Sequence, residues 1–212
     1  MDIDSRPMMD TNRVRRRGRP RGFETDRLVD AAMDLFWVRG YRPTTTRELE
    51  SAMGVKQSSI YNAFGSKDGL LAATLDRYET LADQVLLQPL ETSTEGLRAV
   101  HDFFTTLAQW ITDAGRCGCL LTNMMAEDAG ANAAITQRTR RYRERVRTAL
   151  LGALQRAAEA GEIAVESLEA RASLLLAAVL GLSMVVRARG SQQEFEGVLN
   201  GVQTQIRMWR QA

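Results

Sequence analysis

The chain of 212 residues contains little cysteine, histidine or proline, and each shortage excludes a class of protein. Its two cysteines, Cys117 and Cys119, are too few for a disulfide framework, which is typical of a reducing compartment. The single histidine, His101, excludes catalysis by several histidines and, with so few thiols, a tetrahedral zinc site. We therefore expect neither a metal nor a cofactor. Four prolines leave room for long helices.

Long hydrophobic runs are also absent. The longest apolar stretch, around Leu174–Val186, is amphipathic and shorter than the ~18–20 residues that a membrane span needs. The basic N-terminus is not followed by an apolar segment, so we expect no secretory signal. Hydrophobic residues make up 44% of the chain and charged residues 25%, as in ordinary globular proteins. These features predict a cytoplasmic protein that does not interact with membranes.

Positive charge is concentrated at the N-terminus, although the formal net charge is only +2. Arginines and no acids lie within Thr11–Gly22, where Gly18 and Pro20 disfavour a helix. Residues 1–22 are therefore predicted to form a flexible basic arm. The segment Arg17–Gly22 resembles an AT-hook, whose extended backbone enters a narrow minor groove; the alternative is a solvated, disordered end. The candidate DNA-binding residues of the arm are Arg17, Arg19 and Arg21.

Apolar residues repeat at helical spacing along the chain, and no alternation typical of strands persists. The pattern predicts an all-α fold of about nine helices. They are expected over residues 24–39, 45–53, 57–64, 66–88, 92–113, 119–127, 132–160, 167–189 and 193–210. Two capping boxes, Thr45–Glu48 and Thr92–Glu95, mark helix starts, and Pro89 is expected to stop the fourth helix.

The segment 24–65 has the order helix, short helix, glycine turn, helix, which is the spacing of a helix-turn-helix. Outside its apolar face, hydroxyls, amides, a phenol and cations remain, and these are the groups that bind phosphate oxygens and base edges. The alternative is the ordinary polar face of a small helical bundle, with Ser and Thr serving as helix caps. The candidate DNA-binding residues of this face are Thr45, Thr46, Arg47, Lys56, Gln57, Ser58, Ser59, Tyr61, Asn62 and Lys67.

Three stretches carry a resemblance to a known family. Residues 44–49 read Thr-Thr-Thr-Arg-Glu-Leu, residues 53–64 read Met-Gly-Val-Lys-Gln-Ser-Ser-Ile-Tyr-Asn-Ala-Phe, and residues 66–71 read Ser-Lys-Asp-Gly-Leu-Leu. Over residues 22–72 the chain closely resembles the TetR family of bacterial transcriptional regulators. The resemblance implies a helix-turn-helix DNA-binding domain over 23–70 and a helical effector-binding and dimerisation domain over 71–212.

The resemblance also implies roles for single residues. Thr46 and Arg47 would contact phosphate, and Arg47 sometimes guanine. Residues 57–59 would begin the recognition helix and face the major groove of double-stranded DNA. Tyr61 and Lys67 would each hold a phosphate.

This chain departs from the family pattern at two places. Many members have a serine cap where Lys56 stands, so about 1 kcal/mol of helix capping is expected to be lost and a cation gained. Asn62 and Ala63 are small where many members carry bulky side chains, so the base contacts should differ.

The last two predicted helices lie where the family forms a four-helix dimer interface, so we expect a homodimer through them. Two-fold proteins match two-fold operators, since a lone helix-turn-helix reads few bases. The alternative is that their apolar stripes belong to the core of one chain. The stripes comprise Leu174, Leu175, Ala178, Leu182 and Val185, with Phe195, Leu199, Val202, Ile206 and Trp209.

A pocket for a small-molecule effector is expected among the fourth to eighth helices. Its candidates are methionine and aromatic or aliphatic residues at helical spacing, although core packing is the commoner use of such residues. They are Phe103, Phe104, Leu107, Trp110, Met124, Met125, Tyr142, Leu180 and Met184. Arginines also crowd residues 138–147, opposed only by Glu144. They are either solvated surface with local ion pairs, or they bind an anionic effector or an acidic patch of a partner subunit.

Together these patterns predict a ligand-responsive DNA-binding transcriptional regulator, in the simplest case a repressor that a small-molecule effector releases from a palindromic operator. An alternative is a regulator of the same fold switched by oxidation of Cys119. An enzyme is not expected, because the sequence has no P-loop, no dinucleotide-binding glycine pattern and no paired carboxylates in a recognisable motif. A helical scaffold that binds protein rather than DNA is the remaining class.

Overall fold

The computed structural model describes residues 21–113, 117–128 and 130–210. Its helices are α1 (Arg21–Arg39), α2 (Thr46–Met53), α3 (Gln57–Phe64), α4 (Lys67–Ala82), η1 (Asp83–Leu87), α5 (Gln88–Thr92), α6 (Gly96–Thr112), α7 (Leu120–Asp128), α8 (Ala133–Glu159), α9 (Leu168–Arg187) and α10 (Gln192–Met208). Because α4, the π-helical segment η1 and α5 follow one another without a break, the described residues form nine helices. The all-α prediction is confirmed.

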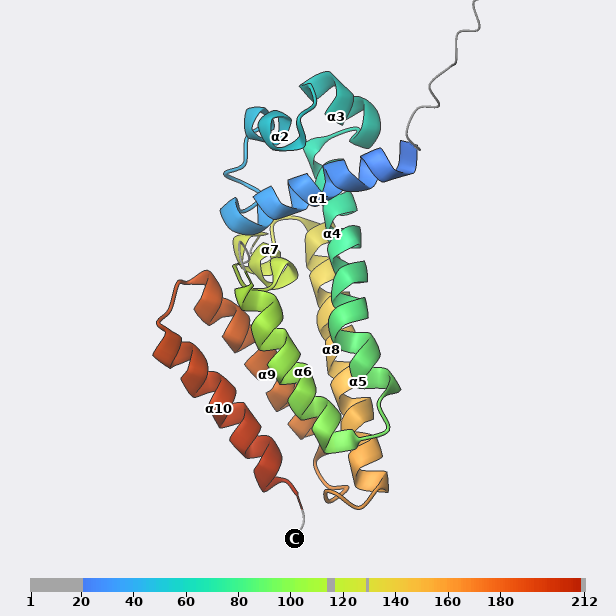
Figure 1. The fold of residues 1–212 in the computed structure, drawn as a ribbon, viewed down its shortest axis with the longest axis vertical. Helices are drawn as coiled ribbons and strands as arrows, with labels where there is room; N and C mark the ends of the chain where they lie inside the picture. Colours follow the sequence, from blue (N-terminus) through green and yellow to red (C-terminus); the bar gives the residue numbers. More distant parts are fainter. Residues whose placement is uncertain (1–20, 114–116, 129, 211–212) are drawn as a thin grey trace, which may run out of the picture.

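Helices α1, α2 and α3 form a small unit at one end of the molecule, which we call the N-terminal head (Figure 1). Phe36, Leu49 and Ile60, one from each helix, are at most 2% exposed and hold the three helices together. The turn between α2 and α3 passes through Gly54 at φ +68°, a left-handed conformation that glycine adopts without strain. Local sequence therefore determines the helix-turn-helix geometry.

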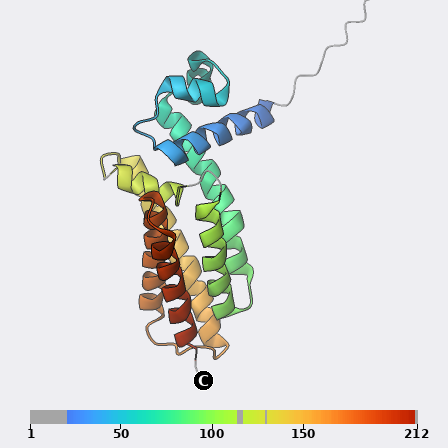
Figure 2. The ribbon, with the colours of Figure 1, turned by 60° about the vertical axis from the view of Figure 1, so that its left-hand side comes forward.

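Helices α4 to α10 form an elongated bundle below the head (Figures 1 and 2). Helix α8 packs against α6, α7 and α9, while α10 covers one side of α9 and α6. The buried apolar residues form one cluster that continues from Trp37 of α1 through Tyr78 of α4 to Leu154 of α8. The head is therefore joined to the bundle by shared core as well as by the chain of α4.

Two details around α5 differ from the sequence prediction. Pro89 does not stop the fourth helix, because it lies in the first turn of α5, where a missing N–H is tolerated. The helix continues to Thr92, whose hydroxyl donates to the Gln88 carbonyl oxygen at 2.8 Å. The predicted Thr92–Glu95 capping box is therefore wrong, and Glu95 is the N-cap of α6 without a side-chain cap.

Helix α9 is, by length and composition alone, long and apolar enough to cross a membrane, so the prediction that this stretch is too short is wrong. In the structure it packs against α6, α7, α8 and α10. Leu175 and Leu182 are buried on its inner side, whereas Leu174 is 53% exposed on the outer side. The helix is apolar on both sides, and this accounts for its composition.

Close contact between α6 and α8 depends on Gly96. A Cβ atom at this position would lie 2.4 Å from the Cα and Cβ atoms of Ala157. We expect Gly96→Ala to lower the free energy of unfolding by about 1–3 kcal/mol, because the two backbones must separate. Urea denaturation followed by circular dichroism measures this change.

The control for this substitution is Gly152→Ala within α8. A Cβ atom at Gly152 meets only the end of the Arg156 side chain, at 3.6 Å. Alanine should therefore raise the free energy of unfolding there, by up to about 1 kcal/mol, since it restricts the unfolded chain. Equal destabilisation by both substitutions would show that the close approach at Gly96 is not the cause.

Candidate nucleic-acid interface and its connection to the bundle

The predicted DNA-binding face lies on α2 and α3, at the end of the molecule away from the bundle (Figures 1 and 2). Its ten candidates between Thr45 and Lys67 are exposed, except Thr46 and Lys67, which are half-buried. Arg21 is the first residue of α1. Arg17, Arg19 and most of the predicted arm lie outside the described residues. The fold thus leaves the predicted face uncovered by the described part of the chain.

Tyr61 connects α3 to the start of α2. Its hydroxyl oxygen accepts hydrogen bonds from the side chains of Thr46 and Gln57, and these bonds, the Thr46 bond first, lower the pKa of Tyr61. A hydroxyl that accepts two hydrogen bonds still has its own O–H to donate. The phenol is therefore held in place as a donor at the surface, a suitable group for a phosphate oxygen.

Two carboxylates near this face are bound to helix N-termini. Glu48 accepts the Thr45 backbone N–H at 2.8 Å, which completes the predicted capping box and is the main reason that the pKa of Glu48 is lowered. Glu50 accepts the Gln57 backbone N–H at 2.5 Å. Lys56 provides no side-chain cap, as predicted, but Glu50 satisfies an N–H at this helix end in its place.

Lys67 is held by a neighbouring turn. Its Nζ donates to the Tyr41 carbonyl oxygen at 2.6 Å and lies 4.3 Å from the centre of the Tyr41 ring. Burial lowers the pKa of Lys67. The Tyr41 hydroxyl donates in turn to Asp68, so both ends of this tyrosine are bound to the first turn of α4. Lys67 therefore positions the α1–α2 turn, and its contact with a phosphate stays a prediction.

Charged side chains of the bundle bind the end of α1 and the turn after it, where the head meets the bundle. Glu127 at the end of α7 accepts the Tyr41 N–H with Oε2 at 3.0 Å and the Arg42 N–H with Oε1. Arg187 of α9 donates to the carbonyl oxygens of Trp37 and Val38, each at 3.3 Å. Gly40, at φ +92°, allows the close approach, because a Cβ atom there would lie 2.7 Å from Glu127 Oε2.

A narrow cavity of about 20 Å³, roughly the room that one water molecule needs, lies within the bundle among α4, η1, α6, α7, α8 and α9. Its walls are mainly apolar, with a few hydroxyls, one thiol and one guanidinium group. The lining residues are Tyr78, Leu86, Leu87, Phe103, Leu107, Cys119, Leu121, Thr122, Met125, Thr139, Tyr142, Arg143, Val146, Leu176, Val179 and Leu180.

Comparison with known proteins matches both parts of this architecture. Residues 28–74 match the family described as bacterial regulatory proteins, tetR family, and residues 94–202 match the tetracyclin repressor-like C-terminal domain. The chain belongs to the TetR family.

Individual TetR-family members agree with this assignment. The HTH-type transcriptional repressor ComR of Escherichia coli K12 is 37% identical over 111 residues, which are 50% of this chain and 52% of ComR, so the match spans about half of that relative. The TetR-family regulator CifR, solved as a cysteine mutant with 26 bp double-strand operator DNA, is 26% identical with a TM-score of 0.74, covering 91% of this chain and 100% of that one. A TetR regulator from Chloroflexus aurantiacus has the same fold, with a TM-score of 0.81 at 23% identity over 90% of this chain and 98% of that one.

The cavity of this TetR-family chain includes part of the predicted pocket. Five of the nine candidates line it: Phe103, Leu107, Met125, Tyr142 and Leu180. Phe104, Trp110, Met124 and Met184 do not line it. The fourth helix was expected to enclose the pocket, but its lining residues Tyr78, Leu86 and Leu87 were not among the candidates. Arg143 was named only within the group of arginines that could bind an anionic effector. Leucines of a long helix give no signal of a cavity, and Arg143 was one of several similar arginines.

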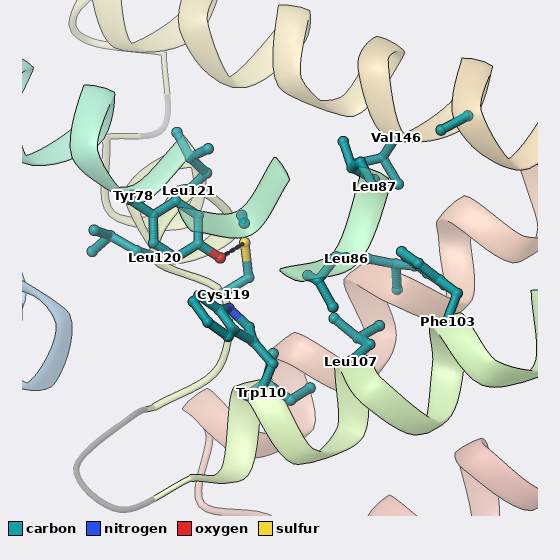
Figure 3. Packing of buried hydrophobic residues seen from close by; sticks show 14 of the residues in the cluster. Tyr78, Leu86, Leu87, Phe103, Leu107, Trp110, Cys119, Leu120, Leu121 and Val146 are labelled. Atoms are coloured by element: carbon teal, nitrogen blue, oxygen red, sulfur yellow. Dashed lines mark hydrogen bonds between the residues drawn. The ribbon is translucent and has the colours of Figure 1, made fainter. Parts of the chain in front are cut away.

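Cys119 lies in the core beside this cavity (Figure 3). Its side chain is 4% exposed, and the Tyr78 hydroxyl donates to Sγ at 3.1 Å. Trp37 contacts the same tyrosine ring in a T-shaped arrangement and Trp110 lies tilted beside it, with ring centroids 5.0 and 6.4 Å from that of Tyr78. An oxidant would have to enter the cavity to reach this thiol, so the packing favours a structural role for Cys119.

The connection between head and bundle can be tested at Glu127. In Glu127→Gln, one of the two backbone N–H groups would face an amide NH₂ instead of an acceptor. We expect the free energy of unfolding to fall by about 1.5–3 kcal/mol, the usual value of hydrogen bonds to a charged group. We also expect faster hydrogen exchange of the Tyr41 and Arg42 amides, measured by NMR.

Glu166→Gln serves as the control, because Glu166 is exposed in the connection between α8 and α9. It should change the free energy of unfolding by no more than about 0.5 kcal/mol. Unchanged exchange at Tyr41 and Arg42 in Glu127→Gln would argue against a carboxylate that fixes this turn.

Proposed function

We propose that this chain is a transcriptional repressor that binds a two-fold operator as a homodimer and leaves it when a small molecule enters the bundle. The observation that carries the proposal is the exposed face of α2 and α3. It presents hydroxyls, amides and cations, while the nearest carboxylates, Glu48 and Glu50, are engaged by the chain's own N–H groups. Such a face suits phosphate oxygens and the edges of bases in the major groove.

The outer side of α9 and α10 supports dimerisation. Leu175, Leu182 and Ile206 of the predicted stripes are buried within the chain. Leu174 is 53% exposed, and the other stripe residues are partly exposed, although all of them except Val185 also pack against the chain's own core. Small residues add to this surface, since a Cβ atom at Gly197 or Gly201 would meet nothing within 4 Å. Exposed Leu174 on α9 and these glycines on α10 suit close packing of two helices from a second copy.

The cavity supports a response to a ligand. Tyr78 of α4 with Leu86 and Leu87 of η1 form part of its wall, and α4 begins directly after the head. A molecule that spreads these walls would shift α4 and with it the α2–α3 face. The two faces of a dimer would then no longer match the spacing of the half-sites. Coupling of this kind is typically worth ~1–3 kcal/mol.

DNA recognition can be tested with an operator selected from a random library. Gln57→Ala should reduce discrimination between bases in the half-site by about 1–3 kcal/mol, because Gln57 would read a base edge. Tyr61→Phe should weaken binding to operator and random DNA alike, since its hydroxyl would hold a phosphate. Mobility shifts at two salt concentrations measure both effects, and a DNA-binding protein should lose affinity steeply at the higher one.

The control is Gln137→Ala, an exposed glutamine on α8 in the bundle. It should leave DNA affinity unchanged. Equal loss on operator and random DNA for Gln57→Ala would contradict base reading by this residue. Binding that does not depend on salt would favour a scaffold for proteins instead.

Dimerisation can be tested at Leu174. Leu174→Asp should give a monomer at micromolar concentration and reduce operator affinity at least about tenfold, since a charge would be buried in the interface. Light scattering after size exclusion measures the mass. The control Val165→Asp changes a residue that is 68% exposed between α8 and α9, and it should leave the dimer intact. A dimer that survives Leu174→Asp would place the interface elsewhere.

A further inference from the structure

The arginines of α8 do not share one role in the structure. Several of them pair with acids of other helices or of their own helix. Arg138 contacts Asp76 at 2.6 Å and Glu79 at 3.3 Å, and Arg145 donates to Glu91 with Nη2 at 2.9 Å. Arg147 contacts Glu144 at 2.8 Å and Glu169 at 2.5 Å, while Arg140 and Arg141 are exposed.

Arg143 differs from all of these. It is half-buried and lines the cavity, and its Nε atom is buried without a hydrogen-bond partner. No contact between Arg143 and a carboxylate is found within residues 21–113, 117–128 and 130–210. A buried N–H without an acceptor is unfavourable in an apolar wall, so its position suggests that another molecule supplies the acceptor.

The other residues that line the cavity with Arg143 restrict the charge and chemistry of that molecule. The lining includes no aspartate or glutamate, so the wall offers nothing to neutralise a cation. Three hydroxyl groups also line the cavity, those of Thr122, Thr139 and Tyr142. Burial raises the pKa of Tyr142, so its phenol stays protonated. Thr139 already donates to the Thr136 carbonyl oxygen at 3.1 Å, which leaves its oxygen as an acceptor.

The remaining wall is formed by leucines, valines, Phe103 and Met125, together with Tyr78 and Cys119, whose hydroxyl and sulfur bind each other. These side chains offer burial to an apolar body rather than hydrogen bonds to a polar one. A single guanidinium group matches one carboxylate, which it can bind through two parallel N–H donors. The cavity is also narrow, so a flat or elongated body would enter with the smallest displacement of the walls.

We propose that the cavity binds an apolar molecule that ends in a carboxylate, with Arg143 as its counter-ion. This inference rests on the proposed ligand response, since it names the chemical class of the effector. It assigns the arginine-rich segment two uses: Arg138, Arg145 and Arg147 join helices, and Arg143 recognises the ligand's charge.

The test uses two matched pairs of probes, 2-naphthylacetate with 2-naphthylacetamide, and decanoate with decanamide. Each pair has one apolar body and differs in the charge of its end group. Titration calorimetry of the full-length protein should show carboxylate Kd values at least about tenfold lower than those of the amides. In Arg143→Met this preference should disappear while binding of the amides stays the same, because methionine keeps an apolar side chain of similar reach.

Two controls separate recognition from folding and from general surface charge. Arg140→Met removes an exposed arginine one turn away on the same helix and should keep the carboxylate preference. Arg143→Met without ligand should melt at the same or a higher temperature than the wild type, because it removes the buried Nε. Equal Kd values for carboxylate and amide, no binding by either carboxylate, or an unchanged preference in Arg143→Met would each overturn the proposal.

The same probes distinguish this inference from the proposed function. Carboxylate binding that depends on Arg143 but leaves operator affinity unchanged would support the site and overturn the ligand response. Operator release by the amides as efficiently as by the carboxylates would support the ligand response and overturn the role of Arg143. Both ideas stand if the carboxylates release the operator and Arg143→Met abolishes that release.

Discussion

The placement of the N-terminal head depends on charged side chains that complete the hydrogen bonds of its backbone. The end of α1 exposes carbonyl oxygens, and the turn after it exposes N–H groups, none of which a helix can satisfy internally. Arg187 supplies donors to the former and Glu127 supplies acceptors to the latter. Because α7 carries Glu127 and also lines the cavity, the contact that orients the head and the wall of the cavity belong to one short helix.

Much of the head could be predicted because its structure is encoded locally. The Thr45–Glu48 capping box and the glycine turn at Gly54 act within a few residues, and both occur as expected. Interactions over long sequence distance could not be predicted in this way. Lys67 was expected to hold a phosphate, and nothing in the sequence indicated that its ammonium binds the Tyr41 carbonyl 26 residues away. The sequence also could not show that the helix continues through Pro89 after a π-helical turn, and for this reason the predicted capping box beyond it failed.

In the bundle, the sequence could not show which apolar residues form the core, which line the cavity and which face outward. Apolar spacing located α9 and α10 within a few residues but did not separate Leu175 and Leu182, which pack inward, from Leu174, which faces outward. A helix that is apolar on two sides meets the composition of a membrane span while packing against four other helices. The cavity was only half anticipated for the same reason, since its leucines are indistinguishable from core leucines until the helices are assembled.

Helix α3 divides its residues strictly between two sides. Ile60 anchors the helix in the head, whereas Ser58, Ser59 and Asn62 are exposed, and no hydrogen bond to another side chain involves them in the described structure. Exchanges at such positions usually alter stability by no more than about 0.5 kcal/mol. The exposed side chains of α3 can therefore be substituted in many combinations without unfolding the head. Over evolution, a descendant of this chain could acquire a new binding preference on this face at little cost in stability.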